Sequence, residues 1–466
     1  HQQQRGCSAP PPRAQAPEER GEGAGTHCVS SWTFRRLEPA WSLSATWIGA
    51  RTRIRTGTEP LKKTLADIDR ATLRGRTVLV RTDLNVRIES GRVLDVQRIE
   101  ASMPTLTTLH EAGARTVVLS HMGRPQGRPS PDLSLASVAA YLGDRLGRPV
   151  LFVRDAVGQG GENAIFALGD GEIALLENTR FHPGETVNDP ELAATWSGLT
   201  DLFVNDAFGA AHREHASTVG LARAVTGRGG DAVAGLLMAR ELEFLGEALE
   251  SPERPFVAIL GGAKISGKID VVEALLPRVD RLLIGGAMAN TFFRAMQLAT
   301  GESLVEENRI DMAGELIEAA GDKLTLPVDC VVARDISPDA QTRVVARAEV
   351  GDMDRIVDIG PETRALYRSI VSSARTVVWN GPMGVFEIPA FAAGTVEVAR
   401  AVADACDAGA LGVLGGGQTA SAAAQAGVVE RLSHVSTGGG ASLALLAGAA
   451  LPGVESLSDR EYDGWL

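Results

Sequence analysis

Short apolar runs alternate with helical patterns along the chain from Leu61 onward, and this alternation limits the fold more than any other feature. The runs are rich in Val, Ile and Leu, and most end in Gly, Asn, Asp or His. In the first half of the chain they occupy residues 76–81, 115–120, 149–153, 173–177 and 201–205. Amphipathic stretches over residues 98–111 and 134–146 lie between some of them. Continuous apolar strands with helical crossovers are typical of a parallel sheet covered on both faces. We therefore predict an α/β, doubly wound parallel sheet for the first half.

The second half repeats this pattern, which predicts a second lobe of the same kind. Its apolar runs occupy residues 255–260, 281–286, 328–333, 375–381 and 410–417. Between the halves, a glycine-rich loop over residues 226–231 precedes a segment in which Leu236, Leu242 and Leu245 recur at helical spacing. We predict two Rossmann-like lobes joined by a long helix over residues 233–249. Two such lobes indicate a hinge and a cleft that opens and closes.

Charge and cysteine content exclude several classes of protein. The net charge of -12 at pH 7 and the pI of about 5.3 argue against a nucleic-acid or anionic-membrane partner, whose binding surface would be basic. Four widely spaced cysteines without a CxxC motif indicate neither a disulfide framework nor a zinc site. No apolar run reaches the roughly 18 residues that cross a bilayer. We predict a cytoplasmic protein, in which any anionic ligand is held by a local cluster of cations.

The first 60 residues differ from the rest of the chain. They are rich in Pro, Gly, Gln and Arg and have no helical or strand periodicity. Glu18, Glu19 and Glu22 argue against an Arg-rich targeting peptide. We predict a disordered extension with no role in the fold.

Polar and basic residues follow the predicted strands of the first half. They are Asp83, Asn85, Arg98, His121, Gly123, Arg124, Arg180 and Arg213. The carboxyl ends of parallel strands share one edge of a sheet, so we expect these residues to converge on one crevice. A guanidinium fork binds carboxylate or phosphate bidentately, and four of them around one pocket favour an anion inside it. The alternative is that each arginine pairs separately with a surface carboxylate. The pattern predicts a small substrate with several negative charges.

Glycines and lysines follow the first strand of the second half. Gly261, Gly262, Lys264 and Lys268 come directly after the run over residues 255–260. The spacing does not match a P-loop. Two lysines four positions apart on one helical face suit a polyphosphate or a migrating phosphoryl group. A solvated pair of lysines is the alternative.

Two further segments of the second half indicate a nucleotide. Glu387 follows a turn-rich loop, where its carboxylate can accept hydrogen bonds from a ribose, although it also fits an ordinary surface glutamate. Gly416, Gly417, Gln418 and Thr419 open a predicted helix, so that backbone N–H groups and the helix dipole face phosphates. A dinucleotide site would need an acidic residue at the end of the next strand, and the chain there reads SHVSTGGG. A dehydrogenase is therefore disfavoured.

Taken together, the motifs resemble the phosphoglycerate kinase family. RTDLNV, SHMGRP, ENTRFHPGE, VNDAFGAAHREHAS, PFVAILGGAKISGKI, VVWNGPMGVFE and STGGGAS appear in the family's order, from about Leu61 to the C-terminus. The resemblance implies an enzyme of glycolysis that transfers a phosphoryl group reversibly between 1,3-bisphosphoglycerate and ADP, giving 3-phosphoglycerate and ATP. It also implies an N-terminal lobe that binds phosphoglycerate, a C-terminal lobe that binds the magnesium complex of ADP or ATP, and a monomer.

The resemblance assigns a role to each candidate residue. The residues that match phosphoglycerate-binding positions are Asp83, Asn85, Arg98, His121, Gly123, Arg124, Arg180 and Arg213. The residues that match nucleotide positions are Lys264, Lys268, Glu387, Gly416, Gly417, Gln418 and Thr419. Arg98 and Lys268 match the residues that meet the transferring phosphoryl group, and are the predicted catalytic pair. Phosphoryl transfer needs positioning and charge stabilisation, so no covalent nucleophile is expected.

Three residues depart from the family's pattern. Gln418 stands where the family has an Asp that binds the nucleotide's Mg²⁺, and a neutral amide oxygen is a weaker ligand for a hard cation. Ile356 stands in place of a Gly beside the nucleotide, and Arg87 in place of a Pro. The leading prediction is an active kinase. The alternative is a paralogue with impaired magnesium binding or a different acyl-phosphate substrate.

The predicted organisation has five parts. They are the extension over residues 1–60, the phosphoglycerate lobe over 61–232, the joining helix over 233–249, the nucleotide lobe over 250–446, and a C-terminal segment over 447–466 that returns to the N-terminal lobe.

Overall fold

The first half of the chain forms a six-stranded parallel sheet. A computed structural model describes residues 61–94 and 96–460. The strands lie in the order β5-β6-β4-β1-β7-β8, and every neighbouring pair is parallel. Their bounds are β1 Thr77–Arg81, β4 Arg115–Leu119, β5 Val150–Val153, β6 Ile173–Leu176, β7 Leu202–Asn205 and β8 Asp231–Ala234. The helices of this half are α1 Gln97–Glu111, α2 Ala136–Leu146, α3 Gln159–Phe166, α4 Pro190–Ser197 and α5 Leu221–Gly227.

Both faces of this sheet are buried. Val78 and Val80 of β1 pack into one apolar core, and Leu79, which points to the opposite face, packs into another. A strand buried on both faces reads as a continuous apolar run, and this explains why β1 was recognisable in the sequence. The predicted doubly wound α/β fold is confirmed for this half.

The second half forms another six-stranded parallel sheet, in the order β11-β10-β9-β15-β16-β17. Its strands are β9 Phe256–Leu260, β10 Arg281–Ile284, β11 Leu324–Thr325, β15 Thr376–Asn380, β16 Leu411–Gly415 and β17 His434–Val435. Its helices are α7 Ile269–Leu275, α8 Met288–Ala295, α9 Ile310–Ala320, α10 Pro361–Ser372, α11 Ala393–Asp407, α12 Gly417–Gln425 and α13 Gly440–Leu446. Alternate residues of β9 again enter different cores, Val257 one and Ala258 the other. Two Rossmann-like sheets are therefore present, as predicted.

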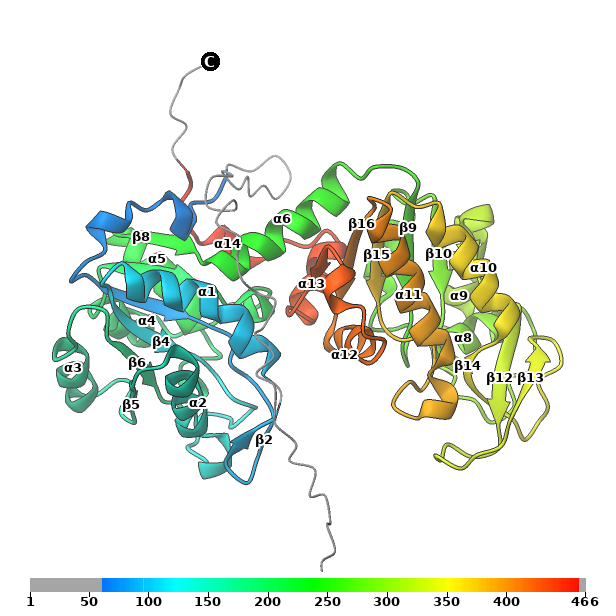
Figure 1. The fold of residues 1–466 in the computed structure, drawn as a ribbon, viewed down its shortest axis with the longest axis horizontal. Helices are drawn as coiled ribbons and strands as arrows, with labels where there is room; N and C mark the ends of the chain where they lie inside the picture. The colour runs from blue at the N-terminus through cyan, green and yellow to red at the C-terminus, as the bar shows by residue number, and fades with distance from the viewer. Residues whose placement is uncertain (1–60, 95, 461–466) are drawn as a thin grey trace, which may run out of the picture. The chain divides into compact units, whose positions relative to one another are not determined.

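Helix α6, Leu236–Glu250, joins the two sheets (Figure 1). The buried carboxylate of Asp206 fixes its start, because Oδ1 accepts hydrogen bonds from the N–H groups of Leu237 at 2.9 Å and Met238 at 3.1 Å. Farther along, the buried Glu241 lies 2.8 Å from Nε2 of His434. The prediction that the helix starts at residue 233 is wrong. Asp231–Ala234 is instead strand β8, paired with β7.

The apolar run over residues 328–333 does not join the parallel sheet, and this prediction is also wrong. The run is β12, Asp329–Ala333, the middle strand of an antiparallel sheet with β13, Thr342–Ala346, and β14, Arg355–Ile359. Four of its five residues are buried, so its sequence looks like that of a parallel strand. In the described ranges, the other antiparallel strands form a short hairpin of two residues each, β2 Ile88–Glu89 and β3 Arg92–Val93.

The end of the described chain packs on the first sheet. Helix α14, Pro452–Glu455, contacts residues that follow β7, because the N–H of Gly453 donates to the carbonyl of Ala211 at 2.9 Å. The N–H of Ser458 donates to the carbonyl of Ala232 in β8 at 2.8 Å. The predictions made for residues 1–60 and for residues 461–466 fall outside the described ranges.

Candidate active site

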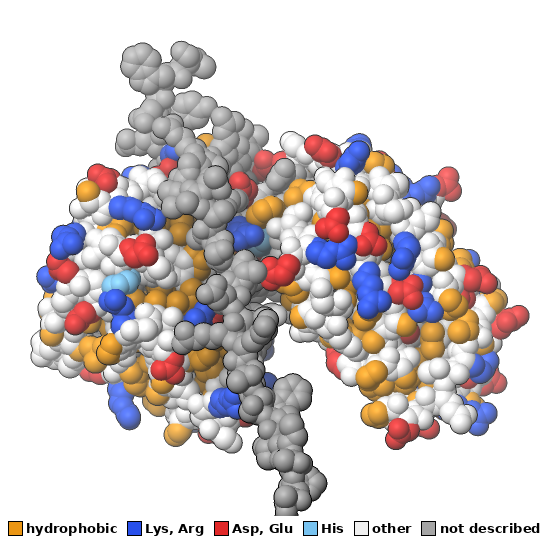
Figure 2. Space-filling view, viewed as in Figure 1, with side chains coloured by type: hydrophobic (Ala, Val, Ile, Leu, Met, Phe, Trp, Pro, Cys, Tyr) orange, Lys and Arg blue, Asp and Glu red, His pale blue; other side chains and the backbone are white. Residues whose placement is uncertain are grey.

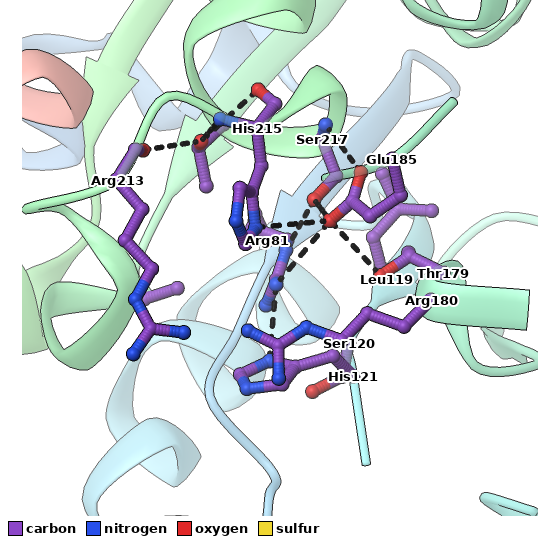
Figure 3. A network of polar contacts seen from close by, with 12 residues as sticks. Arg81, Leu119, Ser120, His121, Thr179, Arg180, Glu185, Arg213, His215 and Ser217 are labelled. Atoms are coloured by element: carbon purple, nitrogen blue, oxygen red, sulfur yellow. Dashed lines mark hydrogen bonds and ion pairs between the residues drawn. The ribbon is translucent and has the colours of Figure 1, made fainter. Parts of the chain in front are cut away.

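A fully buried arginine lies at the base of the candidate site in the first lobe. Arg81 is the last residue of β1 and has no exposed surface. Its Nε donates to Oγ of Ser217 at 2.7 Å, its Nη2 lies 3.1 Å from Nδ1 of His121, and its Nη1 donates to the carbonyl of Thr82. Figure 3 shows this network from close by. Arg81 is not among the residues predicted from the sequence, although a basic residue that ends a buried strand is itself a signal of a site.

Glu185 supplies the charge that balances Arg81. Its side chain is fully buried, and Oε1 lies 3.9 Å from Arg81 Nη2. Its carboxylate accepts hydrogen bonds from the N–H of Ser217 at 2.9 Å, from Oγ of Ser217 at 2.6 Å and from Oγ1 of Thr179 at 3.2 Å (Figure 3). The sequence analysis missed this residue too, since its partners lie on segments far apart in the chain.

The segments after β1 and β4 are tied together at the edge of the sheet. Oδ1 of Asn85 accepts a hydrogen bond from the N–H of Gly123 at 2.9 Å. Arg98, at the start of α1, donates to the carbonyl of Asn85 at 2.9 Å and lies 3.5 Å from Asp83. Gly123 has a φ of +58°, and a Cβ there would stand 2.7 Å from a methyl of Leu133. Arg124, on the same loop, is exposed.

Basic side chains converge on this edge from two more segments. Arg180 follows β6, is 6% exposed, and donates to the carbonyl of Gly123 at 2.7 Å. Burial, with smaller contributions from Arg81 and Arg213, lowers the pKa of Arg180 to about 10. Burial also lowers the pKa of His215 to about 4, with the nearby arginines acting in the same direction. Such a concentration of basic groups favours an anion beside it.

This arrangement contrasts with the outer surface. On the face drawn in Figure 2, the Lys and Arg side chains of the described residues are interspersed with Asp and Glu. At the edge of the first sheet, the structure brings together most of the residues that the sequence singled out. Contacts or charge interactions link Asp83, Asn85, Arg98, His121, Gly123, Arg180 and Arg213.

In the second lobe, two neighbouring strands, β9 and β15, end beside Lys268. Its Nζ donates to the carbonyls of Gly261, after β9, at 2.6 Å and of Asn380, the last residue of β15, at 2.8 Å. Burial lowers the pKa of Lys268 to about 7. An anion beside such a buried ammonium group would stabilise its charged form and raise its pKa.

Lys264 and Lys268 do not share a helical face, so that prediction is wrong. Helix α7 begins only at Ile269, and Lys264 is exposed. The carboxylate of Glu306 accepts hydrogen bonds from the N–H groups of Ile265 at 2.5 Å and Ser266 at 3.0 Å. These bonds hold the lysine segment as a loop instead of a helical turn.

The glycine-rich loop after β16 opens helix α12, as predicted. Gly416 has a φ of +92° and directly precedes the helix. Oγ1 of Thr419 accepts from the N–H of Gly381 at 2.7 Å and donates to the carbonyl of Gly415 at 2.7 Å, which joins the loops after β15 and β16. The N–H groups at the start of α12 carry the positive end of the helix dipole.

Gln418 and Glu387 lie next to each other at the surface of this lobe. Nε2 of Gln418 lies 3.4 Å from Oε1 of Glu387, and both side chains are exposed. Ile356 lies in β14, paired with Val332 of the antiparallel sheet. Within residues 61–94 and 96–460, no group of three or more His, Cys, Asp or Glu side chains could hold a metal ion. One carboxylate and one amide do not by themselves form a metal cage.

These features define a class of protein, a two-lobed α/β protein with a cluster of basic side chains at the sheet edge of one lobe and a glycine-rich loop that opens a helix in the other. The family model described as phosphoglycerate kinase matches residues 68–449. The phosphoglycerate kinase of Chlorobium limicola is 51% identical over 402 residues, which are 85% of this chain and 100% of the relative. That of Moorella thermoacetica is also 51% identical over 402 residues, 86% of this chain and 100% of the relative.

A solved structure of a phosphoglycerate kinase is also similar to this chain. The phosphoglycerate kinase of Coxiella burnetii superimposes with a TM-score of 0.75 at 40% identity, over 85% of this chain and 98% of that chain. The chain belongs to the phosphoglycerate kinase family. None of the helices formed by the described residues is long and apolar enough to cross a membrane.

Proposed function

We propose that this protein is an active phosphotransferase with a carboxyl group as acceptor. It transfers a phosphoryl group reversibly between 1,3-bisphosphoglycerate and ADP, giving 3-phosphoglycerate and ATP, as a step of glycolysis. The observation that carries the proposal is the cluster of basic side chains on the segments after β1, β4, β6 and β7. The buried ion pair of Arg81 and Glu185 lies beneath this cluster. Family membership supports the reaction.

In this proposal the first lobe binds the phosphoglycerate. Asp83 and Asn85 order the loop after β1, and His121, Arg124, Arg180 and Arg213 bind the anionic groups of the substrate. Arg98, at the start of α1, reaches the transferring phosphoryl group. Guanidinium groups suit this role because they bind phosphate oxygens bidentately and stay charged.

The second lobe binds the magnesium complex of ADP or ATP. Lys268 faces the transferring phosphoryl group, Lys264 and the start of α12 at Gly416–Thr419 face the other phosphates, and Glu387 accepts from the ribose. The transferring group carries its charge on three oxygens, so Arg98 and Lys268 stabilise the transition state by position and charge. Closure of the two lobes about the hinge at α6 brings the two substrates together.

A coupled assay on the purified protein, at several magnesium concentrations, tests this function. Turnover with 3-phosphoglycerate and ATP that depends on both substrates is expected. A folded sample without turnover at any magnesium concentration would contradict it. Size measurement by analytical ultracentrifugation tests the further proposal that the protein acts as a monomer, and cell fractionation tests its placement in the cytoplasm.

Gln418 favours a second candidate, a paralogue with impaired magnesium binding. A carboxylate at this position would add a hard ligand beside the phosphates, so Gln418→Asp should lower the magnesium concentration that gives half-maximal rate if the parent is impaired. Gln418→Asn is the matched control, because it has the length of Asp without the charge. Equal magnesium dependence of the parent and Gln418→Asp would remove the case for impairment.

A further inference from the structure

We infer that Arg81 is a positioning residue that fixes His121 as the neutral tautomer with its proton on Nε2. His121 then offers a hydrogen-bond donor to the anionic substrate without carrying a charge of its own. The first statement concerns the protein alone, and only the second rests on the proposed function.

The geometry around His121 decides the tautomer. Arg81 Nη2 lies 3.1 Å from Nδ1 of His121. A guanidinium group only donates hydrogen bonds and keeps its protons in proteins, so Nδ1 must be the acceptor. A neutral imidazole that accepts at Nδ1 carries its proton on Nε2.

Arg81 is itself fixed, so it can hold the ring in one state. Its Nε donates to Ser217 and its Nη1 to the Thr82 carbonyl, and Glu185 balances its charge from 3.9 Å (Figure 3). Arg81 is fully buried and His121 is 5% exposed. If the guanidinium group rotated, these hydrogen bonds would break, and in the protein interior water could not replace them.

The surroundings also keep the ring neutral. Burial lowers the pKa of His121 well below its usual range, and the titratable groups facing it from other segments act in the same direction. These are Arg81 at the end of β1, Arg180 after β6, His215 after β7 and Arg98 at the start of α1. Glu185 makes its ion pair with Arg81. The ring is therefore neutral across the physiological pH range.

His212, on the segment after β7, is held in the opposite way and serves as an internal reference. Nε of Arg213 donates to Nε2 of His212 at 3.0 Å. Here the acceptor is Nε2, so the proton of the neutral ring lies on Nδ1. His121 and His212 should therefore be opposite tautomers.

Long-range ¹H–¹⁵N NMR on the full chain labelled at histidine nitrogens tests the first statement directly. The protein is measured without ligand at pH 7, and His121→Gln and His212→Gln assign the two rings. The expected pattern is a protonated Nε2 in His121 and a protonated Nδ1 in His212. A protonated Nδ1 or an imidazolium at His121 would overturn the inference, and this result does not depend on turnover.

The role of Arg81 is tested by removing its donors without leaving a buried charge. The double variant Arg81→Met with Glu185→Gln keeps side-chain volume and net charge. His121 should then show both tautomers, or titrate to the imidazolium as the pH falls towards 6. If Arg81→Met with Glu185→Gln prevents folding, Arg81→Leu with Glu185→Leu, which also removes the donors and both buried charges, gives the same readout. An unchanged Nε2–H tautomer in the folded variant would contradict the role assigned to Arg81.

The substrate contact is tested with two amide variants. The amide nitrogen of Gln reaches the position of Nε2 in His, and that of the shorter Asn reaches the position of Nδ1. His121→Asn should raise the KM for 3-phosphoglycerate by about tenfold or more, as expected for a lost hydrogen bond to a charged group, and His121→Gln by clearly less. The KM for ATP should stay near that of the parent in both. Equal KM values for 3-phosphoglycerate in the two variants would show that His121 does not donate to the substrate from Nε2, whereas absence of turnover in the parent would contradict the proposed function itself.

Discussion

Arg81 and Glu185 have fully buried side chains whose charged atoms lie 3.9 Å apart. Breaking such a pair from one side leaves an uncompensated charge in the interior, which costs about 3–5 kcal/mol. We predict that Glu185→Gln lowers the free energy of unfolding by about this amount. Urea denaturation followed by circular dichroism measures the change.

The control for this prediction is an ion pair on the surface. Arg87 and Glu89 are also in contact, but their side chains are 73% and 54% exposed. Exposed pairs contribute about 0–1 kcal/mol, so Glu89→Gln should change stability by less than that. If the two variants lose equal stability, the buried pair does not have the role assigned to it.

Lys268 gives a prediction about protons. Burial lowers its pKa to about 7 in the ligand-free protein, and the phosphates of a nucleotide favour the charged form. Its pKa should rise on binding, so the protein takes up a proton at pH 8 and almost none at pH 6, where the ammonium is already formed. Isothermal titration of ATP in two buffers with different ionisation enthalpies measures this uptake.

Two lysine variants make the test specific. Lys268→Met should abolish the uptake, whereas Lys264→Met, which removes the exposed lysine on the same loop, should leave it in place. Uptake that is the same at both pH values would show that another group is responsible.

The sequence alone predicted residues that reach the edge of a sheet but not those beneath them. Arg180 and Arg213 stand out because both follow buried strands, at the sheet edge where α/β proteins bind ligands. Arg81 and Glu185 are important because they form a buried ion pair. This contact depends on how segments distant in the chain fold together, so the pair does not stand out in the sequence. Lys268 was found, but not its burial, because its Nζ is enclosed where two strands distant in the chain, β9 and β15, end side by side.

Among the elements, helix α11 starts against a buried carboxylate. Asp358, in β14, accepts hydrogen bonds from the N–H of Gly394 at 2.6 Å and of Ile359 at 2.9 Å. A Cβ on Gly394 would stand 2.3 Å from Asp358 Oδ1. The carboxylate therefore fixes the start of α11 and one end of the loop that carries Glu387.

This contact predicts how stability depends on pH. Burial raises the pKa of Asp358 to about 7, so between about pH 4 and pH 7 the folded protein holds a proton that the unfolded chain releases. Stability from this group should fall as the pH rises through that range, by as much as about 1.4 kcal/mol per pH unit, and level off above pH 7. Asp358→Asn cannot titrate, so its stability should fall less steeply. Urea denaturation at pH 5, 6 and 7 compares the two slopes, and parallel slopes would contradict the prediction.

The elements show where sequence patterns succeed and where they do not. Strands such as β1 and β9 were predictable because they are apolar throughout and are followed by polar or glycine-rich loops. Strand β8 was assigned to a helix because its residues directly precede the leucines of α6, and Gly235, the single residue between the two elements, was read as part of the helix. Strand β12 is apolar like a parallel strand, and only its partners β13 and β14 make it antiparallel.

For the molecule as a whole, Lys62 ties the two ends of the described chain together. It is 6% exposed, and its Nζ donates to the carbonyls of Glu455 at 2.9 Å and Leu457 at 3.2 Å and to Oδ1 of Asp459 at 2.7 Å. Lys62→Met leaves these acceptors without their donor and should cost about 1–3 kcal/mol. The variant should also release the segment around α14, which limited proteolysis at Arg460 would detect.

The neighbouring lysine is a matched control. Lys63 pairs with Asp231 at 2.9 Å, with side chains 26% and 40% exposed. Lys63→Met should therefore cost less than about 1 kcal/mol and leave the proteolysis pattern unchanged. If both variants behave alike, the C-terminal segment is held by other contacts.

The return of α14 to the first sheet affects the order in which the molecule is completed during synthesis. Domains generally fold as units, starting from the end of the chain that leaves the ribosome first. The first lobe cannot complete its folding in this order. Lys62 and Ala232 hydrogen-bond to Leu457 and Ser458, which are translated after the whole second lobe. The lobe that emerges first therefore reaches its final packing only after the one that emerges second has been made.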